Sequence, residues 1–156
     1  MAKKSLKLVV FTMATDSEAY EYGIPINQVY EITRPGKTIK LPGAPAFLEG
    51  VMNLRESIIP IIDLKKCCAL GTTIPKDTTR IIIVQTNEQK CGVLVDDVLE
   101  IIPIAPENME DVPSVAGGIK SNYLLGIGKA DDRLIITLDM TKILPEREER
   151  ELEMVI

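Results

Sequence analysis

The sequence predicts an all-β protein built from many short strands. Apolar and polar residues alternate along most of its 156 residues, and β-branched side chains are frequent in the alternating segments. Proline and glycine interrupt this pattern at short intervals, as expected where strands end in turns. Because about ten such segments are too many for one small barrel, we expect two packed five-stranded β-barrels.

The strands follow from this alternation, in order along the chain. They are expected at Leu6–Met13, Ala19–Ile24, Ile26–Ile32, Gly50–Leu54, Ile58–Asp63, Thr79–Thr86, Gln89–Asp96, Val98–Ile102, Ser121–Lys129 and Arg133–Leu138. The first is interpreted as a strand and not as a signal peptide, because its apolar run is short and contains Thr12.

The breaks between strands suggest how the chain divides. The small, polar, proline-containing segment Gly71–Asp77 is the best candidate for a join. One barrel then spans about residues 14–72 and the other about 73–144, and the strand at residues 6–13 is an element that the second barrel can share.

Three further segments are not expected to form strands. Those at Pro35–Pro45 and Pro103–Gly118 are expected to be exposed loops. In the tail, residues 145–156, Pro145 and the pairing of Glu146 with Arg150 predict a short C-terminal helix, with a partner-binding tail as the alternative.

The hairpin from Gly50 to Leu64 places Arg55 at a turn between two apolar strands. Its return strand is apolar on both faces, which is typical of a strand buried on two sides, and Pro60 favours an edge or a bulge. We expect this pair to lie between its own barrel core and either the second barrel or a partner.

Several function classes are disfavoured by composition. The chain has no His, which is the commonest general base, and its three cysteines, Cys67, Cys68 and Cys91, lack the number and spacing of a zinc site. A net charge of −5 disfavours binding to nucleic acid. The adjacent Asp96 and Asp97 would point to opposite faces of a strand and are interpreted as a turn. We therefore expect no catalytic residue, cofactor or metal, with a thiol-dependent enzyme as the alternative.

The cysteine count and the lengths of the apolar segments indicate the cellular compartment. The odd number of cysteines fits a reducing compartment, and the chain has no apolar stretch of about 20 residues that would span a membrane. We expect a cytoplasmic protein.

The order of motifs resembles that of the CheW family, the coupling proteins of bacterial chemotaxis. GVMNLRESIIPIIDL is similar to the family pattern Gly-Val-x-Asn-Leu-Arg-Gly, followed by an apolar strand, Pro and Asp-Leu. EAYEYGIPINQVYEI, CGVLVDDVLEI and DDRLIITLDMTKIL resemble further family strands in the family order. Together these segments cover nearly the whole chain, which makes 1–156 a single CheW-like domain.

This resemblance implies a fold of two Src-homology-3-type barrels and a protein without catalysis of its own. The implied partners are the cytoplasmic tip of a chemoreceptor and the regulatory domain of the histidine kinase CheA. The protein would then sit in receptor arrays and meet the membrane only through receptors. A receptor helix would bind an apolar groove between the barrels. The implied partner-binding residues are Arg55, Asn53, Gly50 and Val29, although Asn53 and Gly50 also suit structural roles.

Glu56 departs from the family pattern, which has Gly at this position. If that Gly is left-handed, Glu56 costs about 1–2 kcal/mol of strain. Its carboxylate could also compete with a partner for Arg55, so Glu56 belongs to the candidate site. A scaffold of the same fold in another pathway, for motility or gene regulation, is the alternative function. A small-ligand carrier has no polar constellation in its favour.

Overall fold

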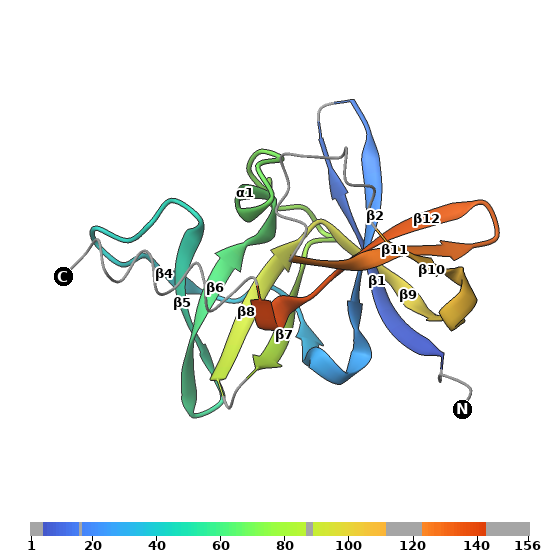
Figure 1. Cartoon of the computed structure of the whole chain (residues 1–156). Helices are drawn as coiled ribbons and strands as arrows, with labels where there is room; N and C mark the ends of the chain where they lie inside the picture. Colours follow the sequence, from blue (N-terminus) through green and yellow to red (C-terminus); the bar gives the residue numbers. More distant parts are fainter. Residues whose placement is uncertain (1–4, 16, 87–88, 112–122, 143–156) are drawn as a thin grey trace.

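The computed structural model describes residues 5–15, 17–86, 89–111 and 123–142, which form two packed six-stranded sheets (Figure 1). The central sheet contains β3 (Val29–Thr33), β4 (Thr38–Ile39), β5 (Leu48–Leu54), β6 (Ser57–Asp63), β7 (Arg80–Thr86) and β8 (Gln89–Val95). The terminal sheet contains β1 (Leu6–Ala14), β2 (Ala19–Pro25), β9 (Asp97–Ile104), β10 (Met109–Glu110), β11 (Leu124–Ala130) and β12 (Arg133–Leu138). The predicted all-β fold is confirmed.

The two sheets repeat one strand order. From edge to edge the central sheet runs β3-β7-β8-β6-β5-β4, and the terminal sheet runs β9-β1-β2-β12-β11-β10. Each contains one parallel pair, β6 with β8 or β12 with β2, among antiparallel neighbours. The β1–β2 hairpin from the start of the chain therefore takes the place that β7–β8 takes in the other sheet.

The repetition extends to single residues. Asp63, at the end of β6, donates its N–H to Phe47 O at 2.9 Å, and Asp139, just after β12, donates its N–H to Tyr123 O at 2.9 Å. Each aspartate side chain also accepts an N–H from two residues further on. The architecture thus repeats where the sequence shows no sustained repeat.

The two sheets do not follow the expected division of the chain between residues 72 and 73. β2, which was expected in the barrel of residues 14–72, belongs to the terminal sheet, while β7 and β8 belong to the central sheet. The segment Gly71–Asp77 connects two parts of the same sheet. Its composition marks a loop, whereas membership of a sheet is decided by pairing between distant strands, which composition does not report.

Strands next to the junction of the sheets are buried on both faces. On β1, Leu8 and Val10 pack inside the terminal sheet, while Val9, Phe11 and Met13 pack in a second core between the sheets. Successive side chains of a strand point to opposite faces, so one apolar run serves two cores.

The same pattern occurs on β7. Ile81 and Ile83 pack inside the central sheet, and Ile82 and Val84 pack in the core between the sheets. Burial of one such side chain contributes about 1.5–3 kcal/mol, so the shared core holds the two sheets as one unit.

The remaining differences from the expectations concern short elements. β4 and β10 have two residues each, too few to show alternation, and raise the predicted five strands per sheet to six. Ile26–Gln28, expected as the start of a strand, is a 3-10 turn (η1), and Pro106–Asn108 forms another (η2). The expected C-terminal helix lies outside the described residues.

A short helix, α1 (Leu64–Cys67), follows β6. Just beyond the helix, Ala69 has a φ of 58°. The N–H groups of Ala69 and Leu70 donate to Lys66 O and Lys65 O, which closes the last turn. This is the Schellman arrangement, in which glycine is the usual left-handed residue. Because alanine occupies that position, the sequence carries no stop signal that would reveal the helix.

No helix within the described ranges is long and apolar enough to cross a membrane.

Candidate partner-binding site

The β5–β6 hairpin is closed by a two-residue turn, Arg55 and Glu56, between the paired residues Leu54 and Ser57. Arg55 has a φ of 56°, a conformation that costs a non-glycine residue about 1–2 kcal/mol. Glu56 is not one of the described residues with positive φ. The strain expected at Glu56 therefore falls on Arg55, because some two-residue turns need positive φ only at their first position.

An ion pair from across the central sheet holds Arg55. Its Nη1 lies 2.9 Å from Glu31 Oε1, and its Nη2 lies 3.5 Å from Glu31 Oε2. Glu31 is on the edge strand β3, which the sheet order separates from β5 by β7, β8 and β6, so the sheet curls until these strands approach each other. The predicted competition for Arg55 thus comes from Glu31 and not from its sequence neighbour.

The Arg55 side chain remains 68% exposed. A pair this exposed contributes about 0–1 kcal/mol to stability, and a guanidinium has five N–H donors. Glu31 therefore orients Arg55 but leaves part of it available to a partner.

The terminal sheet has an equivalent closure. Arg133, at the start of β12, donates from Nε to Glu21 Oε1 at 3.0 Å and from Nη1 to Glu100 Oε1 at 2.6 Å. Glu100 is on β9, the strand that corresponds to β3. The hydrogen bonds that Arg133 donates to Glu21, and to a smaller extent to Glu100, raise the pKa of Arg133 above its ordinary value. Both sheets therefore join an arginine at a hairpin to a glutamate on an edge strand.

Asn53 supports the Arg55 turn from within. With its side-chain amide oriented by the surrounding hydrogen-bonding groups, its nitrogen donates to Arg55 O at 2.9 Å and to Ser57 O at 3.2 Å. These bonds satisfy two carbonyl groups of the turn and give Asn53 a structural role.

Gly50 lies where the β5–β6 register shifts. Its φ is 147°, and a Cβ at this position would lie 2.2 Å from Ile39 O on β4. Glycine is required here because β4 approaches the β5 backbone too closely for any side chain.

The predicted residues do not form one compact patch. Arg55, Glu56 and Asn53 gather at the hairpin turn, but Gly50 is five residues away along β5, or about 16 Å at the usual rise per residue. Val29 begins β3, pairs with Val84 and packs partly buried against the core between the sheets.

An open apolar groove was expected between the barrels, but the apolar side chains that the described residues place between the sheets form a packed core. Large apolar side chains remain exposed on the outer surfaces. Ile32 on β3 and Ile101 on β9 are 40% and 53% exposed, and Ile58 on β6 and Leu134 on β12 are 73% and 60% exposed. Since β3 corresponds to β9 and β6 to β12, the two sheets expose apolar side chains on corresponding strands.

Sequence reasoning missed two contacts made by residues of β3. Glu31 lies within the Val29–Ile32 motif, but its pairing with Arg55 has no local sequence signal. Tyr30, half-exposed on β3, has Lys90 Nζ of β8 at 3.8 Å from its ring centroid, a cation–π contact that reaches across β7.

The described residues do not favour a metal site or a reactive thiol. No three side chains of His, Cys, Asp or Glu gather as metal ligands among them. Cys67 and Cys91 are buried in the core between the sheets. Tyr22 lies in the same core, and burial there, with smaller effects of Cys68 and Tyr20, raises its pKa to about 12.

Comparison with known proteins assigns the chain to a family. A family model described as a CheW-like domain matches residues 7–148. The chain is 30% identical to a chemotaxis protein CheW of Klebsiella aerogenes over 142 residues, covering 91% of this chain and 83% of the relative. It is also 30% identical to protein FrzA of Myxococcus xanthus over 134 residues, covering 82% and 81%.

A solved structure agrees with this assignment. The scaffolding protein TtCheW from Thermoanaerobacter tengcongensis superposes with a TM-score of 0.79 at 38% identity, covering 90% of this chain and 88% of that protein. The chain therefore belongs to the CheW-like domain family.

Proposed function

We propose that this protein is a non-enzymatic adaptor of bacterial chemotaxis that bridges a chemoreceptor and the kinase CheA. The family membership carries this proposal, since the relatives are named chemotaxis and scaffolding proteins. The same proposal places the protein in the cytoplasm, within receptor arrays at the inner face of the membrane.

An adaptor needs two contacts at once, and the fold offers two similar surfaces. The exposed Ile32 and Ile58 belong to the central sheet, and Ile101 and Leu134 belong to the terminal sheet. Exposed apolar side chains that gather on one face mark interaction sites in many proteins. In this proposal one partner contacts the exposed apolar side chains of the central sheet and the other partner contacts those of the terminal sheet.

Arg55 is the proposed polar anchor of the central-sheet surface. Glu31 fixes its guanidinium in an exposed position at the hairpin turn. A partner carboxylate could then bind a preoriented group, which lowers the entropic cost of the contact. Truncating an arginine anchor that is desolvated in an interface often weakens the binding free energy by about 2 kcal/mol or more, which is roughly a thirtyfold loss of affinity.

Asn53, Glu56, Gly50 and Val29 have smaller proposed roles. Asn53 and Gly50 shape the hairpin, Glu56 adds a second charge beside Arg55, and Val29 contributes a partly buried apolar side chain at the start of β3. Substitutions at Asn53 or Gly50 should act on binding through the backbone that they support.

The test is a pull-down with two baits, the regulatory domain of CheA and a cytoplasmic chemoreceptor fragment. Wild type, Arg55→Glu and Lys37→Glu are compared at low and moderate salt. Lys37 is exposed in the loop before β4 and makes the matched charge change away from the hairpin turn. We expect wild type and Lys37→Glu to capture both baits and Arg55→Glu to lose one of them.

A second function is favoured by two observations. Glu56 departs from the family pattern, and one relative carries the name FrzA instead of CheW. A scaffold of the same fold in another pathway would have different partners. If folded wild-type protein captures neither bait, the chemotaxis proposal is wrong and this alternative stands.

A further inference from the structure

A cavity of about 300 Å³ lies where the two sheets meet near α1. Ala14 and Thr15, at the end of β1, line it from the terminal sheet. Lys65 of α1 and Asp96, between β8 and β9, line it from the other side. The cavity therefore joins segments that are far apart in the chain and has the size of a small-molecule site.

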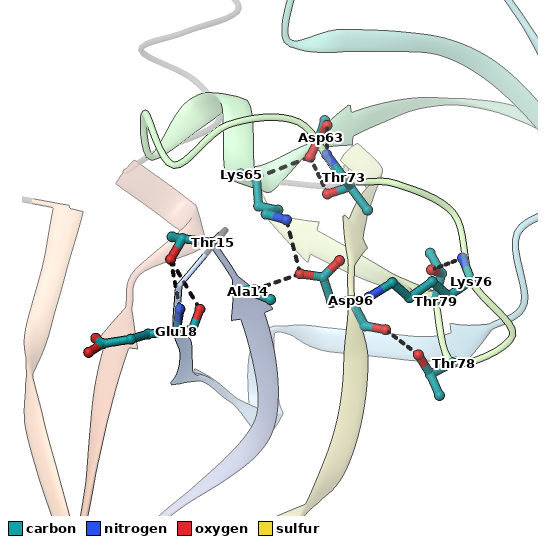
Figure 2. A network of polar contacts seen from close by, with 10 residues as sticks. All are labelled: Ala14, Thr15, Glu18, Asp63, Lys65, Thr73, Lys76, Thr78, Thr79 and Asp96. Carbon is teal, nitrogen blue, oxygen red and sulfur yellow. Dashed lines mark hydrogen bonds and ion pairs between the residues drawn. The ribbon is translucent and has the colours of Figure 1, made fainter.

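A nearly buried ion pair forms part of its wall. Lys65 Nζ lies 3.3 Å from Asp96 Oδ2, and the two side chains are only 9% and 12% exposed. The N–H of Ala14 donates to the same Oδ2 at 2.7 Å. Figure 2 shows Lys65 and the end of β1 meeting at Asp96.

The ion pair leaves hydrogen-bonding capacity unused. An ammonium has three N–H donors, and Asp96 is the one polar group within the described residues that Lys65 Nζ contacts. Asp96 Oδ1 makes no hydrogen bond with those residues either. No buried side-chain nitrogen or oxygen of the described residues lacks a hydrogen-bond partner, so the unused groups of Asp96 and Lys65 are accessible from the cavity, where a bound molecule can engage them.

A second ammonium lines the same cavity. The N–H of Lys76 donates to the Thr79 hydroxyl at 2.8 Å, which fixes the loop, while the Lys76 ammonium makes no contact with the described residues. Among the described residues that line the cavity, Lys65, Lys76 and Asp96 supply two positive charges and one negative charge. Leu70 and Ile74 complete its lining with an apolar side.

The wall is held in place by Asp63, which is fully buried. Its carboxylate accepts the N–H of Lys65 at 3.1 Å and the N–H of Thr73 at 2.9 Å (Figure 2). Asp63 thus fixes α1 and the following loop together, so the charged groups are preorganised before anything binds.

We propose that this cavity binds a small carboxylic acid with a hydroxyl or ammonium group next to the carboxylate. The carboxylate accepts hydrogen bonds from Lys65 and Lys76, and the neighbouring O–H or N–H donates to Asp96 Oδ1. The aliphatic part of the molecule lies against Leu70. This site is independent of the proposed adaptor function and of the Arg55 surface.

Occupancy has a consequence for the fold. The ligand contacts Asp96, whose carboxylate already receives the N–H of Ala14 from the terminal sheet. A ligand that contacts this ion pair should therefore strengthen the junction between the sheets and raise the melting temperature.

The test uses the full chain with L-lactate, L-alanine and propionate as probes at constant ionic strength. Binding is followed by the backbone amide NMR shifts of Gly71 and Thr72, and by the melting temperature. We expect saturable shifts with lactate or alanine. Propionate, which lacks the donor for Asp96, should bind about tenfold more weakly.

Two variants decide whether the response belongs to this cavity. Lys76→Gln removes an ammonium without protein contacts and should weaken binding about tenfold, whereas Lys37→Gln, the same change outside the cavity, should leave it unchanged. A far-ultraviolet spectrum and the melting temperature without ligand confirm that both variants fold. The proposal is overturned if neither lactate nor alanine gives saturable shifts, if propionate binds as tightly, or if both variants respond alike.

Discussion

Replacing Gly50 with alanine should disrupt the contact between β4 and β5. The Cβ would lie 2.2 Å from Ile39 O and 2.9 Å from Thr38 Cγ2, far inside van der Waals contact. The φ of 147° is itself a conformation that residues with a side chain rarely adopt. Because β4 pairs with β5 through only two residues, it should move away and lose those pairs.

The magnitude follows from adding these effects. The backbone strain costs about 1–3 kcal/mol, and each hydrogen bond lost with β4 costs about 0.5–1.5 kcal/mol. We expect Gly50→Ala to lower the free energy of unfolding by about 3 kcal/mol, measured by urea denaturation.

Gly43 supplies the matched control. Its φ is also positive, at 74°, but a Cβ there would have nothing within 4 Å. Gly43→Ala should therefore cost only the conformational term, about 1–2 kcal/mol. If both variants unfold at the same urea concentration, close approach of β4 does not explain Gly50, and its role must be sought in partner binding alone.

Three other predictions concern local features. Ala69→Gly should stabilise the protein by up to about 1 kcal/mol in urea denaturation, because glycine relieves the left-handed residue after α1; an unchanged or lower stability would contradict this. The pKa of Tyr22 is raised from 10.0 in the unfolded chain to about 12 in the fold, so its stabilising effect is complete below pH 10 and is lost as the pH rises from 10 to 12. Tyr22→Phe should remove the last step of the tyrosinate absorbance titration, and an unaltered titration would show that another tyrosine titrates last. Arg55→Ala should change the free energy of unfolding by less than about 1 kcal/mol, because its pair with Glu31 is exposed, yet it should weaken capture of a partner; a large loss of stability would show that the pair is mainly structural.

The sequence alone determined the strands and the family. Alternation is a local property, since a strand buried on one or both faces shows this in its own residues, and all ten expected strands are present. The motif around Arg55 likewise lies within one hairpin. Among the described residues, local patterns failed for elements too short to show them, namely β4, β10, α1 and the 3-10 turns η1 and η2.

The tertiary structure alone decided which strands share a sheet and which charges meet. β1 and β2 join strands from the other end of the chain, and Ala14 meets Asp96 across 82 positions. The partner of Arg55 is Glu31, 24 positions away, and not the adjacent Glu56. Such contacts depend on how the sheets curl and pack, and this depends on the summed burial of side chains from the whole chain. A local pattern reports which face of a strand is buried, but not which distant segment buries it.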